Sequence, residues 1–245
     1  MTPRMAAAGT VLLVALVFAS PLWAQDLSVT FSNGEQLTTR TIQLFALVTL
    51  LSLVPGLAVM ITCFPFIVTV LSILRQAIGL QQSPPNMLIV TLALFLTYFV
   101  MDPVFREAWD RGINPFMTGT LDLETAFSAT LEPFRTFMSA RTDAETFETL
   151  AALRPDIGPV APDMDAPLSV LVPGFLLSEI ARAFQIGFLI FLPFLIIDLV
   201  VSAVLMSMGM MMVPPVIVSL PFKLAFFVIA DGWSLIAGAL VRGYL

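Results

Sequence analysis

Histidine is absent from this chain, cysteine occurs once, and charged residues make up only 11% of its 245 residues. Soluble domains carry about 25% charged residues, so this sequence cannot supply a water-facing surface of ordinary size. Hydrophobic residues make up 58% of the chain. The composition therefore predicts a membrane-associated protein with one large domain.

The missing residue types also exclude several kinds of site. Without histidine and with one cysteine, none of the usual zinc motifs can be built. There is no Gly-x-x-x-x-Gly-Lys phosphate loop and no Gly-x-Ser-x-Gly nucleophile elbow. The net charge of −6 argues against nucleic acid as a partner, because nucleic acid binds basic surfaces. We therefore expect no enzyme, cofactor or metal site, with an intramembrane acid–base reaction at Asp198 as the one enzymatic alternative.

The first 24 residues are typical of a secretory signal peptide. Arg4 supplies the positive charge, residues 6–19 form an apolar core, and "SPLWA" ends in a small residue before Gln25. A first membrane anchor is the alternative, but the core is shorter than the ~20 residues that a span needs. Cleavage would place the short segment 25–40 outside the cytoplasm.

Residues 41–101 form the first predicted apolar hairpin. The stretch 41–74 contains no charge and is punctuated by prolines, which predicts one long helix that is broken or tilted. A loop with Gly79 as the helix C-cap follows. The second helix is predicted over 87–101, where Asp102–Pro103 is expected to end it. The single cysteine of the chain falls in the uncharged stretch and is predicted to be a buried, unreactive thiol.

Residues 102–182 differ in kind, because they hold 13 of the 17 acidic and 6 of the 11 basic residues. Apolar residues recur among these charges at helical spacing: Phe127, Leu131, Phe134, Phe137 and Met138. This pattern predicts amphipathic helices in water or at an interface. We expect the segment to form a large loop on the outer side of the membrane.

Residues 183–245 are apolar again and predict a hairpin of two helices, over 183–208 and 216–240. The break between these helices contains Gly209, Met210, Met211, Met212, Pro214 and Pro215. Non-helical backbone at membrane depth is tolerated where it is buried in protein or lines a cavity. Methionine is flexible and adapts to irregular partners. We therefore interpret the methionine loop as a candidate soft seal, with ordinary gap-filling core residues as the alternative.

Two charges lie inside the helices of this second hairpin. Asp198 lies 14 residues before Met212 and Lys223 lies 11 after it, so the two lie at similar depth. A charged side chain in an apolar helix needs a partner or water. A structural ion pair that fixes the hairpin and a proton relay or gating pair are both open interpretations.

A second charged pair stands at the start of the third apolar helix. Glu179 and Arg182 lie three positions apart on one helical face. They are either a solvated pair that adds little stability or a contact between subunits. Phe137 is a further candidate for such a contact.

Several long stretches resemble the FliP family of flagellar type III protein-export gate subunits, whose injectisome counterparts are the SctR proteins. They are "AFQIGFLIFLPFLIIDLVVSAVLMSMGMMMVPP", "LPFKLAFFVIADGW", "ILRQAIGLQQSPPN", "LALFLTYFVMDPV" and "EPFRTFMSART". The resemblance covers the chain from about residue 41 to its C-terminus. The signal peptide, "AFQIG" and "MMMVPP" favour the flagellar branch over the injectisome branch.

The resemblance implies a pore subunit through which unfolded flagellar proteins cross the bacterial inner membrane. It implies about five copies, the gate partners FliQ and FliR, the assembly factor FliO, and a place in the flagellar basal body with much of the assembly toward the periplasm. The three methionines of each copy would form a gasket at the constriction. The implied fold is an all-α membrane-associated protein with apolar helical hairpins and an amphipathic periplasmic insertion. A small-solute channel is the less favoured alternative, since it predicts a polar or charged lining.

Overall fold

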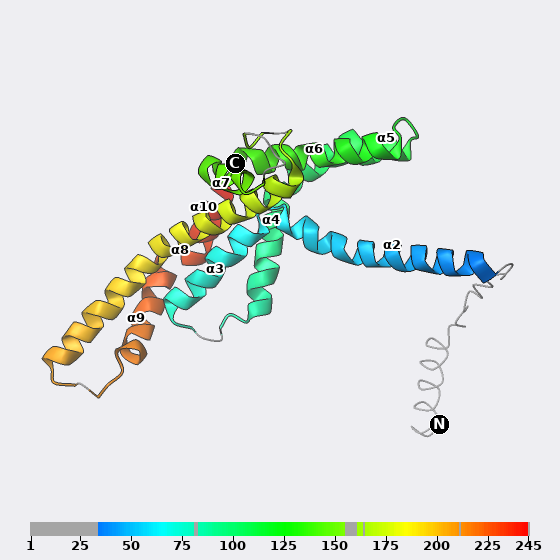
Figure 1. Cartoon of the computed structure of the whole chain (residues 1–245). Helices are drawn as coiled ribbons and strands as arrows, with labels where there is room; N and C mark the ends of the chain where they lie inside the picture. The colour runs from blue at the N-terminus through cyan, green and yellow to red at the C-terminus, as the bar shows by residue number, and fades with distance from the viewer. Residues whose placement is uncertain (1–33, 81–82, 155–160, 164, 211, 245) are drawn as a thin grey trace, which may run out of the picture. The chain divides into compact units, whose positions relative to one another are not determined.

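The computed structural model describes residues 34–80, 83–154, 161–163, 165–210 and 212–244 (Figure 1). Every regular element among these residues is a helix. The chain divides into two compact units, Met1–Leu50 and Leu51–Leu245. The predicted signal peptide and its cleavage point before Gln25 lie outside the described residues.

The uncharged stretch forms two helices, α2 (Gly34–Met60) and α3 (Phe64–Ile78). The prediction of a broken helix is confirmed, and the break lies just before Pro65. Proline suits the first turn of a helix, where its missing N–H group needs no partner. The predicted C-cap is also confirmed, because Gly79 ends α3 with a left-handed φ of 87° and donates its N–H to Gln76 O at 3.0 Å.

The second apolar helix, α4 (Asn86–Ala108), does not end at Asp102–Pro103, so that prediction is wrong. Proline removes one hydrogen bond inside the helix, but Asp102 and Arg106 bridge the same turn with an ion pair of 2.9 Å. Packing of α4 against neighbouring helices also outweighs local propensity. The chain continues through a π-helical turn, η1 (Trp109–Ile113), into the short α5 (Asn114–Met117).

The charged segment forms two helices, α6 (Leu123–Arg141) and α7 (Ala144–Ala152). An aspartate caps each N-terminus. Hydrogen bonds from Thr125 lower the pKa of Asp122, and hydrogen bonds from the backbone N–H and hydroxyl of Thr146 lower the pKa of Asp143. The amphipathic prediction is confirmed for the middle and end of α6, where Met138 is buried.

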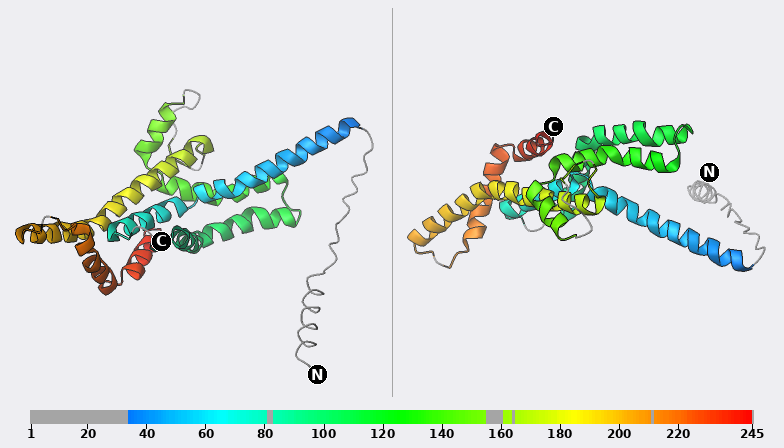
Figure 2. Two further views of the ribbon diagram at one scale, coloured as in Figure 1. Left: turned by 90° about the horizontal axis from the view of Figure 1, so that it is seen from below. Right: turned by 45° about the horizontal axis from the view of Figure 1, so that its top comes forward.

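The last third contains α8 (Leu168–Ser207), α9 (Pro215–Ile229) and α10 (Gly232–Arg242). Figure 2 shows α9 returning beside α8, with α10 turned away from the line of α9. Two boundaries differ from the predictions. Helix α8 begins at Leu168, well before Ala183, because Glu179 is buried against neighbouring helices and Arg182 pairs with it, so these charges do not end the helix. The predicted helix 216–240 is bent by 61° near Asp231, which has a φ of 48°.

Helix α3 lies in the main core, where it packs against α8, α4 and α9. Among the residues that the structure describes, three helical stretches are long and apolar enough to cross a membrane: Thr41–Met60, Asn86–Met117 and Leu168–Ser207. The bent pair α9–α10 is a fourth candidate. Little of these apolar stretches is buried within the chain: in Leu168–Ser207, 11% of the most apolar part is buried. The chain is an all-α membrane protein whose apolar helices extend well beyond its own core.

Gly112 marks the closest approach between η1 and α6, and it gives a testable prediction. A methyl group at Gly112 would lie 2.0 Å from Thr130 Oγ1 and 2.7 Å from both Ala126 O and Thr130 N. Backbone atoms of a packed helix cannot move aside cheaply, so Gly112→Ala is expected to lower the free energy of unfolding by ~1–3 kcal/mol. Thermal unfolding in detergent measures the effect.

Gly56 provides the matched control for this substitution. It lies in helix α2, and a methyl group built there meets nothing within 4 Å. Gly56→Ala should leave the unfolding temperature unchanged or raise it slightly, because alanine favours the helix. Equal unfolding temperatures for the two variants would show that the Gly112 contact is not tight.

Candidate functional site

The tip of the α8–α9 hairpin is built by local hydrogen bonds at the end of α8. Gly209 has a left-handed φ of 74° and donates its N–H to Met206 O at 3.1 Å, and Met210 N donates to Leu205 O at 3.0 Å. This pair of bonds is the Schellman arrangement that ends many helices. A residue with a side chain is strained at that φ, so glycine suits the position.

The methionines follow directly in non-helical backbone. Met210 is 43% exposed and Met212 is 98% exposed, while Met211 lies outside the described residues. Pro214 then forms the N-cap of α9 and Pro215 is its first residue. The residues predicted to break the helix thus lie at the break, where the side chain of Met212 is almost fully exposed and that of Met210 is partly exposed.

The charges inside the hairpin meet about three-quarters of the way along α8. Lys223 Nζ lies 2.6 Å from Asp198 Oδ2, and Ser219 Oγ donates to Asp198 Oδ1 at 2.6 Å. Lys223 Nζ also donates to Ala77 O, at 3.3 Å. Ala77 is in the last turn of α3, where carbonyl groups lack helical partners and attract positive charge. One lysine therefore ties α3, α8 and α9 together.

The two members of this pair differ in their exposure. The side chain of Lys223 is 5% exposed, whereas that of Asp198 is 32% exposed and borders a hollow of about 460 Å³. The buried ammonium group depends on its protein partners, and the carboxylate retains access to solvent. This geometry suits a structural pair, and it leaves one side of Asp198 open.

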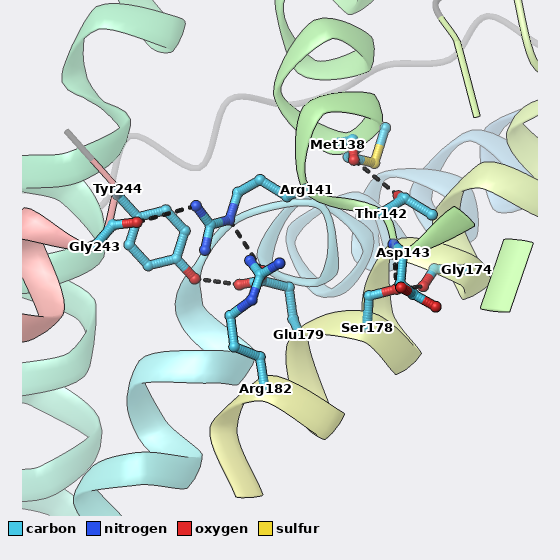
Figure 3. Close-up of polar contacts among 10 residues, drawn as sticks. All are labelled: Met138, Arg141, Thr142, Asp143, Gly174, Ser178, Glu179, Arg182, Gly243 and Tyr244. Carbon is cyan, nitrogen blue, oxygen red and sulfur yellow. Dashed lines mark hydrogen bonds and ion pairs between the residues drawn. The ribbon is translucent and has the colours of Figure 1, made fainter. Parts of the chain in front are cut away.

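The Glu179–Arg182 pair is part of a larger buried cluster (Figure 3). Glu179 is fully buried, so the interpretation of a solvated pair is wrong for this residue. Its Oε1 accepts from Arg141 Nε at 3.0 Å and from Arg182 Nη1 at 3.2 Å, and its Oε2 accepts from the Tyr244 hydroxyl. Burying a carboxylate is costly unless it is paired and hydrogen-bonded, and these contacts meet that need.

Tyr244 connects the cluster to the C-terminal residues. Arg141 lies over its ring, with Cζ 3.8 Å from the ring centroid, and Phe137 stacks on it at a centroid distance of 6.1 Å. Burial raises the pKa of the Tyr244 phenol well above its ordinary value, and the charge of Glu179 raises it further. The contacts of Glu179 and Phe137 are therefore made within the chain, and of the predicted subunit-contact residues Arg182 is the most open to other molecules.

Sequence reasoning missed Ser219, Arg141 and Tyr244. Ser219 had a local signal, because it lies four residues before Lys223 and hence on the same face of one helix. Arg141 and Tyr244 had none, since they lie 38 and 65 positions from Glu179.

The part of the chain that the structure describes holds no group of three or more side chains that could bind a metal ion. Cys63, between α2 and α3, is fully buried. Burial raises the pKa of its thiol to about 12, so the thiol stays protonated at neutral pH.

A family model described as the FliP family matches residues 47–240, which include the methionine loop and both charged clusters except Tyr244. A Caulobacter vibrioides protein named flagellar biosynthetic protein FliP is 46% identical over 230 residues, which cover 94% of this chain and 86% of the relative. Proteins of the same name from Pectobacterium carotovorum and Bacillus subtilis are each 44% identical to this chain. The first alignment spans 240 residues, which cover 95% of this chain and 92% of the relative, and the second spans 217 residues, which cover 87% of this chain and 96% of the relative.

Proposed function

The chain belongs to the FliP family, and on this premise we propose that it is a subunit of the flagellar type III protein-export gate in the bacterial inner membrane. The three relatives described above carry a flagellar name, which supports the flagellar branch over the injectisome branch. The proposed role is that of a structural part of a transport pore and involves no catalysis by this chain.

In the proposed gate, several copies surround a channel through which unfolded flagellar proteins pass. The observation that carries this proposal is the exposed methionine loop, with Met212 98% exposed and Met210 43% exposed. Exposed apolar surface of this kind marks an interaction site or a functional surface. Copies arranged around an axis bring identical loops together. Flexible methionine side chains then close around one another, or around a moving chain of any sequence.

The remaining apolar surface supports contacts with further subunits. The chain itself buries none of the apolar stretch Thr41–Met60 and 11% of the most apolar part of Leu168–Ser207. We propose that other copies, FliQ and FliR cover part of this surface, that FliO assists assembly, and that much of the complex lies toward the periplasm. Glu179, Arg182 and Phe137 take part indirectly, because they fix the surface of α6 and α8 that another copy meets.

Export of flagellar subunits tests this proposal. A Caulobacter vibrioides strain that lacks its own relative is supplied with a chimaera carrying residues 47–240 of this chain in place of the matched segment. Flagellar subunits should reappear in the culture medium, because the relative is 46% identical to this chain. A chimaera that reaches the membrane in normal amounts without restoring export would count against the proposal. Rescue of an injectisome mutant instead would favour the SctR branch.

A further inference from the structure

A narrow hollow of about 190 Å³ lies between α8 and α10, with Phe66 of α3 also in its lining. Its long walls are apolar. Ile186 and Ile190 line it from α8, and Ile236 and Leu240 line it from α10. All these residues belong to the compact unit Leu51–Leu245.

Two guanidinium groups, those of Arg141 and Arg182, stand at one end of this hollow. The lining residues carry no carboxylate; the buried Glu179 behind them pairs with both guanidinium groups, and Asp143 interacts electrostatically with Arg182. Arginine has five N–H donors. Arg141 uses Nε for Glu179 and Nη1 for Gly243 O, and Arg182 uses Nη1 for Glu179 (Figure 3). The remaining N–H groups of these two side chains have no further hydrogen-bond partner among the described residues and are available to an anion.

The hollow is polar at one end and apolar along its length. Ile186 and Ile190 lie four and eight residues after Arg182, so they follow it along one face of α8 over about 12 Å. The next charge along α8 is Asp198. Arg182 borders the uncharged stretch 183–197 of α8, and a long basic side chain that borders an apolar stretch extends toward the lipid headgroups. A ligand that fits has an anionic group at one end and an apolar chain behind it.

We propose that this hollow binds an anionic glycerophospholipid. Its phosphate contacts the guanidinium groups of Arg182 and Arg141, and part of one acyl chain lies between Ile186 and Ile236. Arginine pairs well with phosphate, and basic pockets between membrane helices bind anionic headgroups. A hollow of about 190 Å³ has room for part of an acyl chain but not for a helix from another subunit, which is about 10–12 Å across with its side chains. The inference does not depend on the proposed export role.

Native mass spectrometry of the full-length protein in detergent tests this site, with dioleoyl-phosphatidylglycerol as the anionic probe and dioleoyl-phosphatidylcholine as the zwitterionic one. We expect one tightly retained phosphatidylglycerol per chain. Arg182→Gln should weaken its binding about tenfold or more, because it removes a charged donor. Arg141 and Tyr244 still hold Glu179 in this variant.

Two further variants separate the site from general attraction to charge. Arg242→Gln removes a positive charge at the end of α10, outside the lining, and should leave binding unchanged. Ala239→Phe fills the hollow without changing the charge and should abolish retention. Equal losses in Arg182→Gln and Arg242→Gln, or equal retention of the two lipids by the unaltered protein, would overturn the proposal.

Coverage of the hollow by protein is tested with Ala239→Cys. The chain has one other cysteine, Cys63, which is fully buried, so a disulfide would report the new thiol. Dimers linked through residue 239 in native membranes would show that another copy covers the hollow, and the lipid proposal would be wrong.

Discussion

Replacing Met210, Met211 and Met212 together by alanine is expected to make membranes that contain the assembled gate permeable to small ions. Each substitution removes the flexible part of an apolar side chain, and a closed ring repeats the loss in every copy. Assembly should persist, because Met212 is 98% exposed and makes little packing contact within the chain. Ion flux across the membrane and the yield of the complex are the two measurements.

Single methionine substitutions should have smaller effects than the triple one. Neighbouring methionine side chains can move into a gap left by one of them. Met87→Ala and Met206→Ala provide matched controls, because both residues are exposed but lie in helices outside the break. Membranes that contain either control variant should not become permeable to small ions.

Two outcomes would contradict the proposed seal. Unchanged ion flux with a normal yield of the triple variant would place the constriction elsewhere. Loss of the complex would show that the methionines pack between subunits, as the alternative interpretation of gap-filling core residues holds.

Removing Asp198 is expected to destabilise the hairpin more than removing Lys223. Asp198→Ala leaves a buried ammonium group with Ala77 O as its remaining described partner, and losing one member of a buried pair costs ~3–5 kcal/mol. Lys223→Met leaves a carboxylate that still accepts from Ser219 and is 32% exposed, so water can solvate it. Asp198→Ala should therefore lower the stability more than Lys223→Met, because the side chain of Lys223 is more deeply buried than that of Asp198.

The double variant Asp198→Ala/Lys223→Met should recover part of the stability lost in Asp198→Ala. It removes both charges and leaves none unpaired in the interior. Thermal unfolding and the yield of the complex measure the recovery. A double variant no better than Asp198→Ala would refute the pairing, and a role of Asp198 in handling protons would then gain support.

The sequence by itself determined the class of the protein and the positions of its local breaks. The scarcity of charge predicted apolar helices, and the amphipathic pattern predicted the helices of the charged segment. Gly79, Gly209 and Pro215 were identified as helix ends because their effect depends on their own backbone: glycine adopts a left-handed φ, and proline restricts φ and lacks an N–H donor. The helix ends at these residues need no distant partner.

Only the tertiary structure decided which charges are buried and where the long helices continue. The sequence predicted that one helix ends at Asp102–Pro103 and that another begins at Ala183. In the structure α4 continues through Pro103, and α8 begins before Ala183. Glu179 is buried because Arg141 and Tyr244, 38 and 65 positions away, donate to it. A local pattern cannot specify such partners, because the stability of a buried carboxylate depends on groups that meet only when the chain has folded.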